Sequence, residues 1–225
     1  MNKEAYFTPG NIESVSREMV DRLAPLRERH CRQVFEASQA ALLVLDMQRY
    51  FLEEASHAFI PSAPAILPGI QQLVEVFRSR NRPVILTCHI NTAANAGMMA
   101  GWWRDLIQGE SPLSQVVDGL AHSGFQEIRK SQYDAFFETS LEQILQDGGV
   151  KQVLICGVMT HLCCETTARS AFMRGFEVFV LVDGMATYNS QFHEAALLNL
   201  AHGFAYPLQV SEIGTLLAKE STWLR

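Results

Sequence analysis

The fold of this chain can be read from one stretch, VLICGVMTHLCCETTARSAFMRGFEVFVLVDGMAT, residues 153–187. It opens with a short continuous apolar run at 153–155 and closes with a longer one at 178–182. Such runs are typical of strands that are buried on both faces of a parallel sheet. The residues between them predict a helix over about 161–174 that stops at Gly175. The stretch therefore predicts a strand, a crossover helix and a second parallel strand.

The same alternation continues on either side of this stretch. Further apolar runs occupy residues 41–45 and 84–86. Apolar side chains recur at helical spacing within 70–77 and 141–145, and a last helix is predicted over about 190–202. Strands that alternate with helices indicate a three-layer, doubly wound α/β domain with a mainly parallel sheet.

The composition narrows the class of protein. The chain has 225 residues, of which 48% are hydrophobic and 19% charged, and a formal net charge of −6. A chain of this size and apolar content buries a substantial core, which excludes a disordered or collagen-like protein. The acidic balance argues against nucleic-acid binding, which needs clustered Lys and Arg. We expect a small-molecule substrate as the partner, and neither nucleic acid nor membrane.

The sequence also bears on the compartment. No run of about 18 apolar residues is present, and the N-terminus MNKEAYFTPG lacks the short apolar core of a secretory signal. The five cysteines are an odd number without a CxxC pair, which argues against a disulfide framework and against a zinc knuckle. We therefore expect a cytoplasmic protein.

Residues 1–40 stand apart from the α/β rhythm. They are more polar, and the spacing of Val15, Met19 and Leu23 predicts a helix. Forty residues are too few to hold a core of their own. We interpret them as an N-terminal helical extension that packs on the domain formed by residues 41–225, or on a partner subunit.

Residues 89–124 interrupt the rhythm a second time, with several glycines and no regular period. Long irregular insertions of this kind are usually functional or disordered. The adjacent pairs Met98–Met99 and Trp102–Trp103 indicate an ordered apolar surface, which is either a wall of a substrate pocket or a subunit interface. With this apolar patch we expect a homo-oligomer.

Chemistry is expected just after the strands, because open α/β sheets bind ligands beyond the carboxyl ends of their strands. Three residues there form a working set. Cys163 opens the predicted crossover helix, where free backbone N–H groups favour a thiolate. Lys130 ends residues 125–130, a candidate for another short strand, and adds a positive charge that lowers the thiol pKa further. Asp46 follows the first run and can accept and return a proton.

These segments resemble the isochorismatase-like cysteine hydrolase superfamily. The resemblance runs from about residue 41 to 212, and three motifs carry it. LLVLDMQRYFL at 42–52 is similar to the family's first strand with its catalytic Asp. EIRKSQYDAFFETSLEQIL at 127–145 is similar to its Lys segment, and the stretch 153–187 to its nucleophile segment. The resemblance implies about six mainly parallel strands with helices on both sides.

The resemblance also implies a mechanism. Asp46, Lys130 and Cys163 would be a catalytic triad that attacks an amide carbonyl and forms a thioester. A cis peptide between Val158 and Met159 would turn the backbone N–H groups of Met159 and Cys163 toward an oxyanion. Family members with Cys at the nucleophile position are amidases, whereas true isochorismatases carry Gly there. Cys163 therefore predicts hydrolysis of a small non-peptide C–N bond, an amide or carbamoyl compound.

Two other functions stay open. DMQRYFL, and His161 with the Thr166–Thr167–Ala168 sequence, resemble the isochorismatase side of the family, which hydrolyses a vinyl ether without a covalent intermediate. A catalytically idle member that serves as a binding subunit is the third possibility. The presence together of all three triad residue types argues against it.

The resemblance also bears on cofactors and on substrate contacts. Nicotinamidase-like members bind a metal through an Asp and His residues after the catalytic Asp and after the second strand. Here the first of these stretches reads Arg49-Tyr50-Phe51-Leu52-Glu53-Glu54, with His57 only later, so the full ligand set is missing. We expect no metal, no cofactor and a substrate other than nicotinamide. The candidate substrate-binding residues are Gln48, Tyr50, His89, Trp102, Trp103 and His161.

Overall fold

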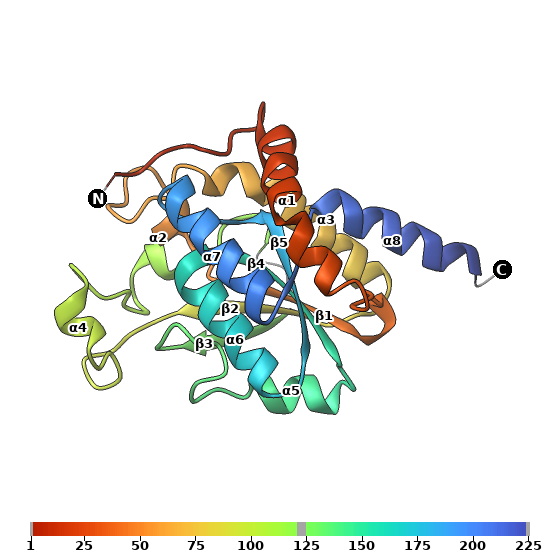
Figure 1. Ribbon diagram of the computed structural model, residues 1–225. Helices are drawn as coiled ribbons and strands as arrows, with labels where there is room; N and C mark the ends of the chain where they lie inside the picture. The colour runs from red at the N-terminus through yellow and green to blue at the C-terminus, as the bar shows by residue number, and fades with distance from the viewer. Residues whose placement is uncertain (1, 121–124, 224–225) are drawn as a thin grey trace.

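The computed structural model describes residues 2–120 and 125–223 (Figure 1). Within them, six strands form one sheet in the order β3-β2-β1-β4-β5-β6, and every pair of neighbours is parallel. The doubly wound α/β fold predicted from the sequence is thereby confirmed. The strands are β1 (Ala40–Leu45), β2 (Val84–His89), β3 (Gln126–Lys130), β4 (Gln152–Val158), β5 (Glu177–Ala186) and β6 (Tyr206–Leu208).

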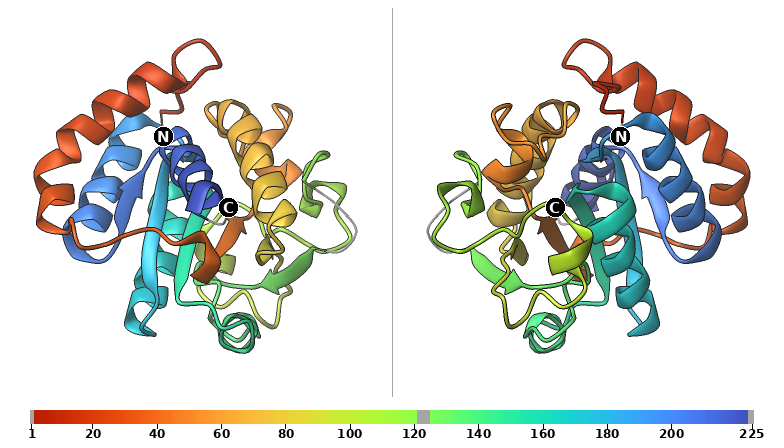
Figure 2. Two further views of the ribbon diagram at one scale, coloured as in Figure 1. Left: turned by 90° about the vertical axis from the view of Figure 1, so that its right-hand side faces the viewer. Right: turned by 90° about the vertical axis from the view of Figure 1, so that its left-hand side faces the viewer.

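Helices cover both faces of the sheet and complete the three layers (Figure 2). Helices α3 and α8 pack together on one face, and α6 and α7 pack together on the other. None of the described helices is long and apolar enough to cross a membrane. The helices are α1 (Ile12–Arg29), α2 (Arg49–Leu52), α3 (Ala63–Ser79), α4 (Met99–Trp102), α5 (Leu141–Asp147), α6 (Glu165–Met173), α7 (Ser190–Gly203) and α8 (Val210–Trp223).

The winding of the sheet reverses between β1 and β4. The chain leaves β1 toward β2 and β3, returns to β4 beside β1, and then continues outward through β5 to β6. In folds of this kind the crevice at the carboxyl ends of the strands, at the point of reversal, is where ligands bind. The residues that follow β1 and β4 therefore lie where a ligand is expected to bind.

The close approach of β1 and β4 depends on Gly157. Leu45 of β1 pairs with Gly157 of β4, and Gly157 has a φ angle of +112°. A Cβ atom added at this position would lie 2.1 Å from the carbonyl oxygen of Leu45. Only glycine meets both demands, so the end of β4 can lie directly against the end of β1.

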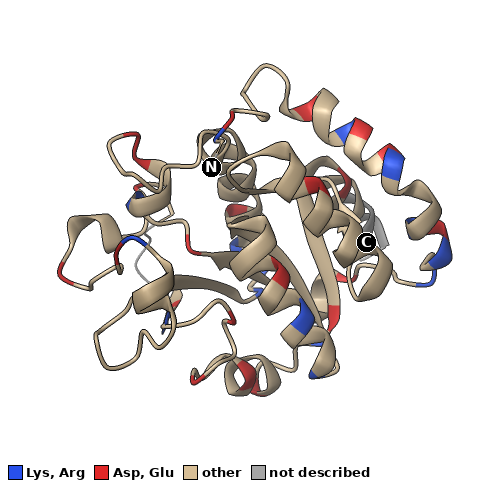
Figure 3. Cartoon of the chain, turned by 60° about the vertical axis from the view of Figure 1, so that its left-hand side comes forward, with Lys and Arg blue, Asp and Glu red and all other residues tan. Residues whose placement is uncertain are grey.

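The N-terminal extension packs on the chain's own domain. Helix α1 lies against α7 and the edge formed by β5 and β6, with Met19, Val20 and Leu23 buried beneath it. Acidic and basic residues lie close together along α1 (Figure 3). Arg17 forms an exposed ion pair with Glu13 over 2.7 Å. The segment before α1 is also anchored, because the ring of Phe7 is fully buried in the core.

Candidate active site

The carboxyl ends of three strands bring Asp46, Lys130 and Cys163 into one buried cluster. Asp46 follows β1, Lys130 ends β3, and Cys163 lies in the π-helical turn Thr160–Cys164 between β4 and α6. The Lys130 ammonium Nζ lies 2.8 Å from Asp46 Oδ2 and 3.3 Å from Cys163 Sγ. The three predicted triad residues therefore touch one another although they are far apart in the sequence. We call them the buried cluster.

Asp46 is held in one orientation by its backbone and by Thr87 of the neighbouring strand β2. Its φ angle is +52°, in the left-handed region that non-glycine residues seldom adopt. Its backbone N–H donates to the carbonyl of Thr87, and the Thr87 hydroxyl donates to Asp46 Oδ1 over 2.6 Å. The other carboxylate oxygen, Oδ2, is thereby left to face Lys130. A side chain fixed in this way is pre-organised for proton transfer.

Lys130 is surrounded by acceptors. In addition to Asp46 and Cys163, its ammonium lies 3.3 Å from His89 Nδ1 and donates to the carbonyl of Gln132 over 2.9 Å. The parallel pairing of β2 with β3 sets this geometry, because it places His89 directly beside Lys130. Burial alone would lower the pKa of Lys130, but the Asp46 carboxylate and the Cys163 sulfur raise it above the ordinary value. Lys130 is therefore a fixed positive charge.

The state of the Cys163 thiol differs from the sequence-based expectation. Burial raises the pKa of Cys163 to about 12; Lys130 lowers the pKa, whereas Asp46 raises it. The expected lowering by Lys130 is present, but loss of water and the neighbouring carboxylate outweigh it. Burial and the carboxylate therefore favour the neutral thiol over the thiolate in the resting site. Its proton has an acceptor at hand in Asp46, so a nucleophilic sulfur requires proton transfer within the cluster.

Hydrogen bonds to the backbone and to His193 fix the turn that carries Cys163. The backbone N–H groups of Leu162 and Cys164 both donate to the carbonyl of Met159, at 3.1 and 3.2 Å. Thr160 Oγ1 lies 2.8 Å from His193 Nδ1, and the other ring nitrogen of His193 bonds the carbonyl of Val182 in β5. The peptide bond between Val158 and Met159, at the start of this turn, is cis.

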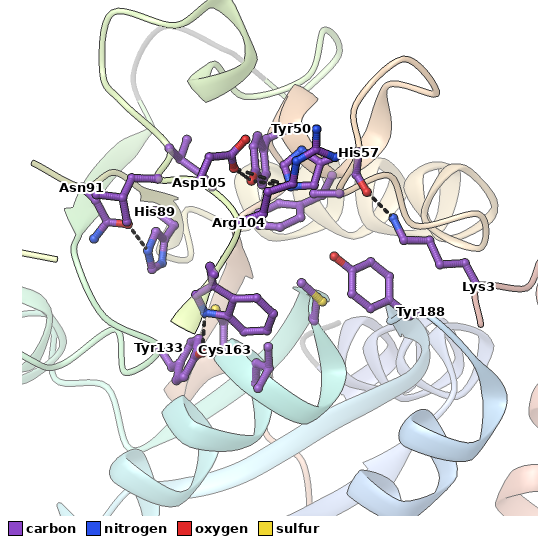
Figure 4. Close-up of a pocket in the computed structure, with 17 residues that line it drawn as sticks. Lys3, Tyr50, His57, His89, Asn91, Arg104, Asp105, Tyr133, Cys163 and Tyr188 are labelled. Atoms are coloured by element: carbon purple, nitrogen blue, oxygen red, sulfur yellow. Dashed lines mark hydrogen bonds and ion pairs between the residues drawn. The ribbon is translucent and has the colours of Figure 1, made fainter. Parts of the chain in front are cut away.

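A cavity of about 330 Å³ opens above Cys163 (Figure 4). Its wall is mostly apolar, and Cys163, Leu162 and Met159 contribute to it from the nucleophile turn. Of the predicted substrate-binding residues, Tyr50, His89 and Trp103 line it. Trp103 also donates from Nε1 to the hydroxyl of Tyr133 over 2.8 Å. The insertion at 89–124 therefore supplies part of the pocket wall, one of the two roles considered for it.

Three predicted substrate-binding residues lie outside the cavity lining. The side-chain amide of Gln48 is fully buried and bonds only backbone groups, the N–H and carbonyl of His89 and the carbonyl of Ser114. His161 stacks on Phe192 and bonds the Thr187 hydroxyl. Trp102 is 75% exposed. Proximity in sequence to Asp46, Cys163 or Trp103 did not predict which way these side chains point.

Several lining residues were missed by the sequence analysis: Lys3, His57, Asn91, Arg104, Asp105, Tyr133 and Tyr188. Asn91 follows His89 by two positions and bonds its Nε2 over 2.9 Å, a spacing that signals a shared loop after β2. Arg104 and Asp105 directly follow the Trp pair that drew attention to the insertion. Lys3 and His57 carry no local signal, because only the folded chain brings them to the cavity.

A divalent metal does not fit the buried cluster. Asp46, His89 and Cys163 offer ligand atoms that lie within 4.8 Å of one another, the one such group of His, Cys, Asp or Glu found in residues 2–120 and 125–223. The Lys130 ammonium already contacts all three of these atoms. Burial, together with this ammonium, lowers the pKa of His89 to about 4. A second cation would meet a charge that is already in place.

The family model of the isochorismatase domain matches residues 40–212 of this chain. Among curated proteins, the chain is 40% identical over 172 residues to nicotinamidase 3 of Arabidopsis thaliana, covering 74% of this chain and 83% of that protein. It is 30% identical over 170 residues to enterobactin synthase component B of Escherichia coli strain K12. That match covers 74% of this chain and 59% of the longer relative.

Solved structures share the fold. A cysteine hydrolase from Pseudomonas syringae pv. phaseolicola 1448A aligns with a TM-score of 0.79 at 24% identity, over 82% of this chain and 95% of that one. The pyrazinamidase of Pyrococcus horikoshii, determined in complex with zinc, aligns with a TM-score of 0.68 at 29% identity, over 76% of this chain and 99% of that one.

Proposed function

Because this chain belongs to the isochorismatase family, we propose that it is a cysteine hydrolase that cleaves a small, non-peptide amide or carbamoyl C–N bond. One observation carries the proposal. A buried Asp46–Lys130 ion pair contacts the sulfur of Cys163 at the floor of a largely apolar cavity. A nucleophile, a proton acceptor and a fixed positive charge are the groups that acyl transfer through a thioester needs.

In the first half of the reaction, the substrate carbonyl carbon lies above Cys163 Sγ. As the C–S bond forms, the thiol proton passes to Asp46, and the carbonyl oxygen takes up negative charge. The backbone N–H groups of Met159 and Cys163 stabilise this oxyanion. The C–N bond then breaks, the nitrogen takes the proton from Asp46, and ammonia or an amine leaves a thioester on Cys163.

In the second half, water attacks the thioester and gives its proton to Asp46. The C–S bond breaks, the carboxylic acid product forms, and the sulfur regains the proton. Lys130 keeps its charge throughout and stabilises each anionic state of Asp46 and Cys163. The neutral resting thiol fits this cycle, because Asp46 needs to be ionised to accept the first proton.

The experiment is a screen for ammonia release from nicotinamide, pyrazinamide and N-carbamoyl amino acids, with isochorismate tested in parallel. The wild type is compared with Cys163→Ala and with Cys31→Ala, which removes an exposed thiol. We expect turnover of an amide by wild type and Cys31→Ala and none by Cys163→Ala. The acyl-enzyme should appear as a mass increase on the peptide that contains Cys163.

The other outcomes identify the alternatives. Turnover of isochorismate that survives in Cys163→Ala contradicts the covalent mechanism and supports vinyl ether hydrolysis. Binding without turnover of any tested compound supports a binding subunit instead of an enzyme.

A further inference from the structure

The charges that line the cavity are predominantly positive. Lys3 and Arg104 carry the cations, and Asp105 carries the only carboxylate among the described lining residues. Asp105 is already engaged, because it accepts a hydrogen bond from the Tyr50 hydroxyl and lies 3.5 Å from His57 Nε2. The whole chain has a net charge of −6, so this local excess of positive charge runs against the overall balance.

Lys3 is held at the cavity wall by neutral groups. Its ammonium donates to the carbonyls of His57 and Phe59, at 2.6 and 2.8 Å, and lies 4.4 Å from the centre of the Tyr188 ring. No carboxylate of the described residues forms an ion pair with it. An ammonium has three N–H donors, of which these carbonyls take two. Its charge is therefore positioned but not neutralised.

Hydrogen bonds to two other segments of the chain fix the backbone around Lys3. Glu4 donates its N–H to the carbonyl of Tyr188 over 2.8 Å and accepts from the N–H and hydroxyl of Ser190. Phe7 donates its N–H to the Ser62 hydroxyl over 3.1 Å. Residues 2–8 thus form a strap between the end of β5 and the loop before α3. The strap lies outside the region 40–212 that matches the family.

In the view of Figure 4, Lys3 and Tyr188 lie on one side of the cavity, His89 and Asn91 on the other, and Cys163 between them. We propose that Lys3 is a specificity-determining residue that binds a carboxylate of the substrate while the scissile amide lies over Cys163. The preferred substrate is then a small amide that also carries a carboxylate. This inference rests on the proposed function, because it deepens the assignment of that same site.

The first test measures turnover of matched pairs. The probes are malonamate, succinamate and glutaramate, each with its methyl ester, which keeps the amide and removes the charge. We expect the wild type to prefer the acids, and Lys3→Met to lose about tenfold of that preference, mainly through KM. Lys3→Arg should retain the preference, and so should Lys151→Met, which removes a positive charge just before β4, at the amino ends of the strands and away from the cavity.

The second test does not depend on turnover. Alkylation of Cys163 by iodoacetate and by iodoacetamide compares an anionic reagent with a neutral one of similar size. We expect the ratio of the two rates to fall in Lys3→Met and to be unchanged in Lys3→Arg and Lys151→Met. A strap that is merely loosened alters both rates together and leaves their ratio unchanged.

The two tests separate the two proposals. If no amide is hydrolysed, the proposed function is wrong, and the alkylation ratio still decides the role of Lys3. If amides are hydrolysed but Lys3→Met keeps the wild-type preference for acids and the wild-type alkylation ratio, the role of Lys3 is overturned while the hydrolase assignment stands.

Discussion

At the scale of single residues, the protonation state of Cys163 is the central feature. The thiol is buried and the Asp46 carboxylate lies beside it, so its pKa is raised to about 12 despite contact with Lys130. The sulfur is therefore expected to become nucleophilic only when its proton moves within the buried cluster, because a free thiolate is disfavoured. In the proposed mechanism Asp46 has two opposing effects, since it disfavours the thiolate at rest and accepts the thiol proton during attack.

This opposition predicts a separation of reactivity from turnover in Asp46→Asn. Removing the carboxylate removes a charge that raises the thiol pKa, so Cys163 should react with iodoacetamide several-fold faster at pH 8 than in the wild type. Turnover should fall by at least about 10²–10⁴-fold, because the proton acceptor is lost. Lys130→Met should shift the labelling rate in the opposite direction.

Peptide mass spectrometry resolves the labelling rate at each cysteine, with the exposed Cys31 as the internal standard in every variant. Slower labelling of Cys163 in Asp46→Asn than in the wild type would contradict this account of the thiol. Undiminished turnover in the same variant would remove Asp46 from the mechanism.

At the scale of secondary-structure elements, the site depends on how tightly the ends of β1 and β4 approach. Asp46 and the nucleophile turn follow directly after the pair Leu45 and Gly157. A shift of either strand end moves the carboxylate relative to the thiol, and displacements of about 1 Å can cost 10²-fold in rate. The glycine in β4 is thus part of the positioning of the site.

We expect Gly157→Ala to lower the free energy of unfolding by about 3 kcal/mol or more, because the added Cβ atom has no space and the φ angle is unfavourable. Gly101→Ala is the matched control. It adds the same methyl group in α4, where no atom beyond the adjacent residues and the helix's own backbone lies within 4 Å of the new Cβ. Urea unfolding of both variants measures the difference, and equal midpoints would show that β4 can move away from β1 at little cost.

At the scale of the whole molecule, the burial of histidine and cysteine side chains sets the pH range in which the folded state is most stable. His89 and His193 are buried, and burial lowers their pKa values to about 4 and about 3. Below about pH 6.5 the unfolded chain binds a proton on each imidazole and the folded chain does not. Burial also raises the pKa values of Cys88 and Cys163 to about 12, so above about pH 8.5 the unfolded chain loses thiol protons that the folded chain keeps.

Histidine protonation therefore destabilises the folded state below about pH 6.5, and thiol ionisation destabilises it above about pH 8.5. Each histidine should reduce the free energy of unfolding by about 1.4 kcal/mol per pH unit between pH 6.5 and its folded pKa, and each thiol by a similar amount above pH 8.5. In His193→Gln we expect the acid slope to decrease by one such contribution. His202→Gln, at an exposed position in α7, should keep the full slope. Urea titrations from pH 4.5 to 7 measure this, and identical slopes in both variants would contradict it.

Much of the fold was predictable from the sequence because its signals are local. Continuous apolar runs at 41–45, 153–155 and 178–182 mark buried parallel strands wherever they occur in a chain, and the helical periods between them dictate crossovers. Asp46, Lys130 and Cys163 were predictable for the same reason. Each lies at a strand end or a helix start, within a motif that is continuous in sequence, and the sheet brings those ends to one edge.

Only the tertiary structure decided what the neighbouring side chains do. Gln48, His161 and Trp102 lie near the site in sequence, but none of them lines the cavity. Gln48 bonds backbone groups, His161 stacks on Phe192, and Trp102 is exposed to solvent. Lys3 reaches the cavity through contacts with residues more than fifty positions away. The neutral state of the Cys163 thiol is equally non-local. Desolvation depends on every element that encloses a group, and no short segment of sequence contains that information.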